Sequence, residues 1–172
     1  MYNITYTMKK IKGIVNSCLQ KLRRLDKELL DINVNERTIT HKLAEYLQEH
    51  FPEFNVDCEY NRDRNYIKRI RNKRDRSKEI ANLSNFKLAE LIWENKEADT
   101  IYPDIIVHKR TTHKNNLLII EVKKKPNPNT GEFDKEKIEE LMERPYNYKF
   151  GLFLRIDLDD EDDILEWFPQ EN

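Results

Sequence analysis

Apolar residues recur every three or four positions in two early segments of the chain. Residues 8–32 carry such a stripe between lysines, arginines and aspartates, which predicts an amphipathic helix. We expect it to pack on the domain or on a second copy of the chain. A second stripe, which ends at Phe51, predicts another helix. Asn33 or Asn35 would cap the start of this helix, and Pro52 would end it.

The following segments show the period of two, or the short apolar runs, that are typical of strands. In residues 54–61, Phe54, Val56, Cys58 and Tyr60 alternate with polar residues, so the four are expected on one face. A short helix capped by Asp134 is predicted between the third and fourth strands, and a helical pattern covers residues 79–96. The further strands are predicted at residues 102–108, 117–123 and 148–156.

Without the first helix, the basic insertion and the acidic tail, the core order is helix, strand, strand, strand, helix, strand. This order predicts an α/β fold with a mixed central sheet flanked by helices. At 172 residues the chain is expected to form a single domain. Its parts would be a core at about 33–156, an N-terminal amphipathic helix at 1–32, a basic, helical insertion at 62–100 and an acidic tail at 157–172.

The composition narrows the class of protein. Charged residues make up 37% of the chain, and the net charge is only −1, so any preference for a charged partner must come from how the charges are distributed. No apolar stretch approaches the ~20 residues of a membrane span, and residues 1–12 lack the apolar region of a secretory signal. Cys18 and Cys58 are expected to be buried, reduced thiols. A cytoplasmic protein with no membrane partner is expected.

The charges gather in one segment, residues 62–78, where nine lysines and arginines face two aspartates. Such an excess favours contacts with the phosphates of a nucleic acid, although a solvated surface gives the same pattern. The acidic tail could compete for this surface, or it could be a short polar helix end that keeps the protein soluble. The candidate nucleic-acid contacts are Tyr60, Arg62, Arg64, Lys68, Arg69 and, after the third strand, Lys125.

Two acids and a lysine lie where strands of the sheet begin or end. Asp104 leads the second strand, and Glu121 and Lys123 share a face at the end of the third, on the side expected for Leu117 and Ile119. Two carboxylates ~4 Å apart repel by roughly 4 kcal/mol at an effective dielectric constant of 20. A divalent cation turns this repulsion into attraction, and oxygen ligands suit Mg²⁺ or Mn²⁺.

Pro103–Asp104, followed by Glu121–Val122–Lys123, resembles the motif of the PD-(D/E)XK nuclease superfamily, which has the restriction-endonuclease-like fold. The core of that superfamily is a helix, three strands, a helix and a strand, and the resemblance covers residues 33–156. It implies that Asp104, Glu121 and the carbonyl of Val122 bind the metal and that Lys123 is the catalytic lysine. It also implies a supporting acid on the first core helix, where Glu36 stands.

The expected function is therefore a Mg²⁺- or Mn²⁺-dependent nuclease that hydrolyses phosphodiester bonds, with DNA favoured as substrate and with repair, restriction or defence as roles. One alternative is a catalytically inactive subunit of the same fold that binds nucleic acid or assembles with partners. A second is a structural or regulatory protein that forms a homodimer through residues 8–32.

Several of these residues also have ordinary structural interpretations. Asp104 could cap a turn after Pro103, and Glu121 with Lys123 could be the solvated end of an edge strand. Glu36 could close a capping box with Asn33. Glu59 is a candidate additional acid, but a strand with one wet face explains it equally well. His108 could line the cleft or be an ordinary polar histidine.

Overall fold

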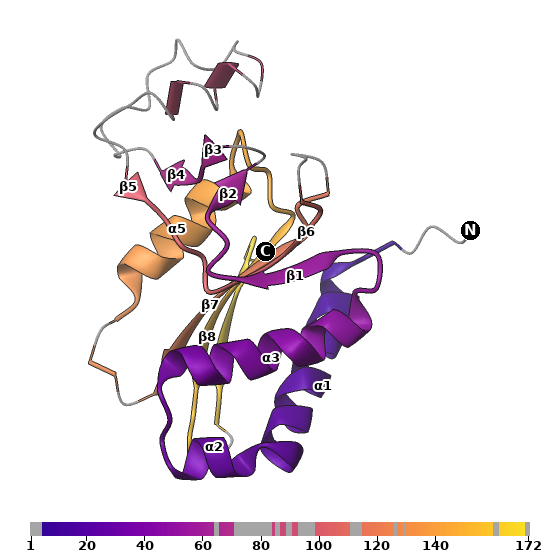
Figure 1. Ribbon diagram of the computed structural model, residues 1–172, viewed down its shortest axis with the longest axis vertical. Coiled ribbons are helices and arrows are strands. Elements are labelled where there is room, and N and C mark those ends of the chain that lie inside the picture. Colours follow the sequence, from indigo (N-terminus) through magenta and orange to yellow (C-terminus); the bar gives the residue numbers. More distant parts are fainter. Residues whose placement is uncertain are drawn as a thin grey trace.

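The computed structural model describes residues 5–63, 66–70, 84, 87–88, 91–92, 99–110, 115–125, 127–128, 130–159 and 162–170. The helices α1, α2 and α3 pack on one face of a central sheet and α5 packs on the other (Figure 1). The helices are α1 (Met8–Leu25), α2 (Lys27–Asp31), α3 (Glu36–His50) and α5 (Glu132–Met142). The strands are β1 (Asn55–Cys58), β2 (Arg62–Asp63), β3 (Tyr66–Ile67), β4 (Arg69–Ile70), β5 (Asp99–Thr100), β6 (Ile105–His108), β7 (Leu118–Lys124), β8 (Phe150–Ile156) and β9 (Ile164–Phe168).

The main sheet is mixed, with the strand order β1-β6-β7-β8-β9. Only β7 and β8 pair in parallel, and the other three pairs are antiparallel. The connection between this parallel pair contains α5, which crosses one face of the sheet as a parallel connection requires. The predicted α/β class and the predicted order of core elements are confirmed.

Two apolar clusters cover the two faces of this sheet. One cluster joins α1, α2 and α3 to alternate residues of the strands, including Ile120 and Val122 of β7. The other joins α5 to the residues between them, including Ile106 and Ile119. Adjacent residues of β7 therefore belong to opposite layers, and this alternation sends Glu121 and Lys123 toward α5 while Lys124 points toward α3. Leu117, which precedes β7, packs in the first cluster, so its predicted place on the Glu121 face is wrong.

The N-terminal segment forms two helices where one was predicted over residues 8–32. The helix α1 begins after Thr7, whose side chain accepts a hydrogen bond from the amide of Lys10, and it ends at Leu25. Asp26 separates it from α2. Ile11, Val15, Cys18 and Leu22 are fully buried against the rest of the chain, whereas Leu25 and Ile32 are exposed. Most of the apolar stripe therefore packs within one molecule, and the predicted homodimer stays a prediction.

The acidic tail ends in a strand that the sequence analysis missed. Residues 164–168 form β9, which pairs antiparallel with β8 and extends the sheet to five strands. The tail is therefore not a polar helix end. Before β9, Asp163 accepts a hydrogen bond from the amide of Asp157 and pairs with Arg23 of α1.

The basic insertion begins with short strands rather than with a helix. The strands β2 and β3 pair with each other, and β4 pairs with β5, where the chain returns to the main sheet. Most of the predicted helical segment 79–96 lies outside the described residues.

Among the helices of the part of the chain that the structure describes, none is long and apolar enough to cross a membrane. Both cysteines are free; Cys18 is buried and Cys58 is partly buried.

Candidate functional site

The two acids of the motif meet across the pairing of β6 with β7. Ile105 lies opposite Ile120 in the antiparallel register. Asp104 directly precedes Ile105 and Glu121 directly follows Ile120, so the same register, continued by one residue, would bring the two acids opposite each other, and the charge of Asp104 acts on Glu121. Residues opposite each other in such a pair point to the same face of the sheet. The Asp104 carboxylate also accepts a hydrogen bond from the Val122 amide at 2.8 Å, which holds it beside the end of β7. Asp104 is thus part of the sheet edge rather than the cap of an isolated turn.

Glu121 is fully buried, which excludes a solvated strand end. Its burial, followed by the nearby charge of Asp104, raises the pKa of the Glu121 carboxyl well above its usual value. Lys137 of α5 forms an ion pair with Glu121, with 2.6 Å between its Nζ and Oε2 of Glu121. No donor among the described residues forms a hydrogen bond with Oε1 of Glu121. A buried carboxylate oxygen with no donor is costly and is well suited to bind a cation.

Lys123 lies between two acids from different layers. Its Nζ is 3.5 Å from Oε1 of Glu36 on α3 and 3.4 Å from Oδ2 of Asp134 on α5. Burial lowers the pKa of Lys123, but the charges of Asp134, Glu36 and Asp104 outweigh it and raise the pKa above the usual value. The side chain is therefore a charged ammonium at the edge of the site.

Glu36 connects α3 to the end of β7. Asn35 caps α3 by accepting a hydrogen bond from the amide of Thr38, so the predicted capping box of Glu36 with Asn33 does not form. The Glu36 carboxylate instead accepts a hydrogen bond from the Lys124 amide at 3.1 Å and reaches Lys123. Glu36 therefore lies beside the end of β7, and its role as a supporting acid stays a prediction.

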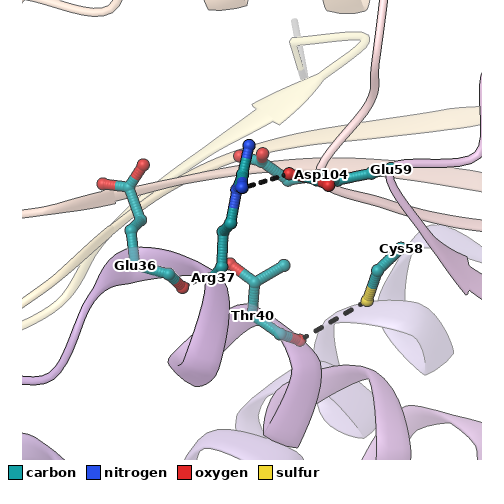
Figure 2. A pocket seen from close by; sticks show the side chains of 6 residues that line it. All are labelled: Glu36, Arg37, Thr40, Cys58, Glu59 and Asp104. Atoms are coloured by element: carbon teal, nitrogen blue, oxygen red, sulfur yellow. Dashed lines mark hydrogen bonds and ion pairs between the residues drawn. The ribbon is translucent and has the colours of Figure 1, made fainter.

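A pocket of about 310 Å³ opens beside Asp104, between the start of α3 and the end of β1. Figure 2 shows Arg37 reaching from α3 across this pocket toward Glu59, with which it forms an ion pair of 2.8 Å. Glu36, Thr40 and Cys58 complete the lining. Glu59 therefore borders the site, as a partner of Arg37.

Glu59 also changes the face on which the next residue lies. Its backbone has a φ of 49°, in the left-handed region, so the alternation of β1 stops there. Tyr60 packs with the second cluster, against the ring of His108, and not on the face of Val56 and Cys58 as predicted.

His108 is an internal polar residue and not part of the cleft. It is 3% exposed and shares a hydrogen bond of 2.9 Å with Asp57, which Arg110 also contacts. Burial raises the pKa of Asp57, but the hydrogen bonds from His108 and Arg110 outweigh it and hold that pKa well below its usual range.

Two of the predicted nucleic-acid contacts point inward. Lys68 is 1% exposed, its Nζ donates a hydrogen bond to the Tyr60 carbonyl, and it lies over the rings of Tyr60 and Tyr148. A lysine enclosed in this way cannot reach a backbone phosphate, so its predicted role is wrong. Tyr60 is used in the same packing.

The other predicted contacts differ in their exposure. Arg62 is exposed and Arg69 is half-buried, whereas Arg64 lies outside the described residues. Lys125 forms ion pairs with Asp157 and Asp162 at 2.9 and 2.8 Å. The acidic tail therefore covers Lys125, rather than a described part of the basic segment, and only Arg62 remains a plainly exposed candidate.

Asp134 and Lys137 of α5 belong to the site, and sequence reasoning assigned neither to it. Gly131, not Asp134, precedes the first residue of α5, with a left-handed φ of 78°. Asp134 and Lys137 are spaced like the buried Ile138 and Leu141 along the same helix face. Charged residues within an apolar stripe were the available signal.

The donors at this site fit a divalent cation by charge and by chemistry. Four carboxylates face two ammonium groups, which leaves two negative charges if all are ionised; the acids are Glu36, Asp104, Glu121 and Asp134. Oxygen donors of this kind suit Mg²⁺ or Mn²⁺. Among the described residues, no three acidic, histidine or cysteine side chains lie close enough together to share an ion.

Comparisons with known proteins found no matching family model, no matching curated protein and no matching solved structure.

Proposed function

We propose that this protein is a metal-dependent nuclease that hydrolyses phosphodiester bonds in nucleic acid, with DNA as the preferred substrate. The observation that carries the proposal is the meeting of three charged side chains at one end of the sheet: Glu121 is fully buried, partly buried Asp104 precedes the strand paired with it, and Lys123 lies on the same face of β7. A pattern of solvated surface charges does not explain a fully buried acid with a second acid and a lysine near it.

The order of elements supports the same proposal. A helix, three strands, a helix and a strand are the core of the PD-(D/E)XK superfamily. The chain has α3, β1, β6, β7, α5 and β8 in that order, with the short strands β2 to β5 inserted between β1 and β6. The acids and the lysine occupy the positions on the second and third strands that the resemblance implies. The restriction-endonuclease-like fold is therefore our preferred assignment.

Each side chain at the edge has a role that follows from its position. Asp104, Glu121 and the Val122 carbonyl would hold Mg²⁺ or Mn²⁺, which would supply charge neutralisation and polarisation of the bonds that react. Lys123 donates hydrogen bonds that can orient an attacking water, and its charge offsets the negative charge that develops on the phosphate. Glu36 fixes the end of β7 through the Lys124 amide and holds Lys123 in place.

The nucleic acid would approach over the pocket beside Asp104 and the base of the insertion, where Arg62 is exposed. The guanidinium of Arg37, with a side chain 82% exposed, lies at the same mouth. Cations in these places would contact phosphates and make the affinity fall with salt concentration.

One observation favours a second candidate, a protein of the same fold that binds nucleic acid without cutting it. Lys137 already neutralises Glu121, and an ammonium in that position is compatible with a site that no longer uses a cation. Binding of nucleic acid without uptake of Mg²⁺ or Mn²⁺ would distinguish this candidate from the nuclease.

Cleavage of a labelled panel of single- and double-stranded DNA and RNA tests the proposal. We expect the parent protein to cut at least one substrate in Mg²⁺ or Mn²⁺ and to stop in EDTA. Asp104→Ala and Lys123→Ala should reduce the rate by at least about a hundredfold, because each removes a group that acts on the reacting phosphate. Equal rates for parent and variants would disprove the assignment.

A further inference from the structure

Lys137 lies in the interior of the proposed site, although the motif does not include it. Its side chain projects from α5 toward the sheet and is 8% exposed. Its Nζ is 2.6 Å from Oε2 of Glu121 and 3.4 Å from Oδ1 of Asp134. A lysine in such surroundings needs these negative charges to keep its proton, and the two acids provide them.

A cation that binds Glu121 must compete with this ammonium group. Both would neutralise the same buried carboxylate, and two positive charges so close to each other repel strongly where little water screens them. Lys137 therefore has to withdraw when the cation arrives. Asp134 is the acceptor that is already within reach, since it contacts Lys137 through one oxygen and Lys123 through the other.

We propose that Lys137 is a built-in counter-ion of Glu121, which a divalent cation displaces toward Asp134 when it binds. The inference rests on the proposed metal site and says how that site is regulated. Lys137 keeps the buried acid neutralised at low cation concentration and so raises the concentration of Mg²⁺ or Mn²⁺ at which the site fills. When Lys137 pairs with Asp134, the ion pair between Asp134 and Lys123 weakens, and Lys123 can then contact the phosphate.

Calorimetric titration with Mn²⁺ tests the proposal without any measurement of cleavage. Lys137→Gln removes the charge and keeps a polar side chain, and Lys137→Met keeps the length of the aliphatic stem. Lys135→Gln is the matched control, because Lys135 lies on the same helix but pairs with Glu166, which is outside the site. All proteins are first treated with EDTA, dialysed into chelator-free buffer and compared at one ionic strength, with circular dichroism as the check of folding.

We expect both Lys137 variants to bind Mn²⁺ at least about tenfold more tightly than the parent, because the competing charge is gone. Lys135→Gln should bind like the parent. If a Lys137 variant is less stable than the parent after EDTA treatment, Mn²⁺ should raise the Tm of the variant by more than it raises the Tm of the parent.

Affinity in the Lys137 variants that equals or falls below that of a metal-binding parent would overturn this inference and leave the proposed function standing. No binding of Mn²⁺ by the parent or by any variant would overturn the proposed metal site and this inference together. Binding by the Lys137 variants alone would overturn the displacement of Lys137 in the parent and would favour the candidate that binds nucleic acid without a metal.

Discussion

The hydrogen bond from the Lys124 amide to Glu36 should be the main link between α3 and the end of β7. We therefore predict that Glu36→Ala and Glu36→Gln differ in stability. A hydrogen bond between an amide and a carboxylate contributes about 1.5–3 kcal/mol, and the side chain of Glu36 is 29% exposed, which favours the lower end of that range.

Two smaller contributions accompany this hydrogen bond. The ion pair with Lys123, whose atoms are 3.5 Å apart, adds about 0.5 kcal/mol, and the negative charge in the first turn of α3 adds about 0.5 kcal/mol more. Glu36→Ala loses all three contributions and should lower the free energy of unfolding by about 2–3 kcal/mol. Glu36→Gln keeps an acceptor for the amide and should lose only about 1 kcal/mol.

Urea unfolding at 25 °C, followed by circular dichroism, measures the difference. A change of about 2–3 kcal/mol corresponds to a fall in Tm of roughly 4–12 °C for a domain of this size. Glu45→Ala is the matched control, because Glu45 lies on the same helix and pairs with Lys42 and His41, neither of which belongs to the site. If Glu36→Gln is as unstable as Glu36→Ala, or if Glu36→Ala matches the control, the hydrogen bond does not link the two elements.

Three further predictions follow from the burial and the charges of individual residues. Lys68→Met should lower the free energy of unfolding by about 1–2 kcal/mol and leave DNA affinity unchanged, whereas Arg62→Ala should weaken DNA binding and reduce its salt dependence. Fluorescence anisotropy at several salt concentrations measures both affinities, and a reversed result would contradict our assignment of Lys68 as buried and Arg62 as exposed. Asp57 has a lowered pKa in the folded protein, so its stabilising contribution is present above about pH 4 and is lost as the pH falls further. In urea unfolding between pH 2 and 5, the free energy of unfolding of Asp57→Asn should depend less on pH than that of the parent, and equal pH dependence would contradict this assignment. Gly131→Ala should lower the free energy of unfolding by at least about 2 kcal/mol, because Gly131 has a positive φ and crowded surroundings, whereas Gly13→Ala, in an open helical position, should raise it by about 0.5–1 kcal/mol. Thermal unfolding tests both variants, and an unchanged stability of Gly131→Ala would contradict the close packing of α5 on the sheet.

The core of the fold could be predicted because its elements show the expected hydrophobic periods. The continuous run in β7 and the helical stripe of α3 place their own buried faces without any knowledge of the tertiary contacts. The register of β6 with β7 was not predictable in detail, but the position of Asp104 and Glu121 at the ends of apolar runs was enough to place both acids at one sheet edge.

The errors have local physical causes that the hydrophobic pattern does not record. The break at Asp26 leaves the apolar stripe unchanged, because Leu22 and Leu30 stay buried on either side of it. The left-handed backbone at Glu59 turns Tyr60 to the opposite face, and a non-glycine residue gives little warning of such a conformation. The strand β9 was hidden by the run of acids before it.

Some charged residues of the site could be predicted from the sequence and others could not. Glu121 and Lys123 lie within a recognisable motif, whereas Lys137 is buried because it pairs with Glu121 where α5 packs on the sheet. Lys68 was assigned by the charge of its segment, although one cation of such a segment can turn inward and pack on aromatic rings. Composition describes the segment as a whole and not the direction of each side chain.

Anomalous diffraction from crystals soaked in Mn²⁺ tests the central claim most directly. We predict a peak within about 2–2.5 Å of carboxylate oxygens of both Asp104 and Glu121, next to the Val122 carbonyl, and we predict its loss in Glu121→Gln crystals. A saturating soak that gives no peak between these two carboxylates would contradict the proposal that this sheet edge is a metal-dependent catalytic site.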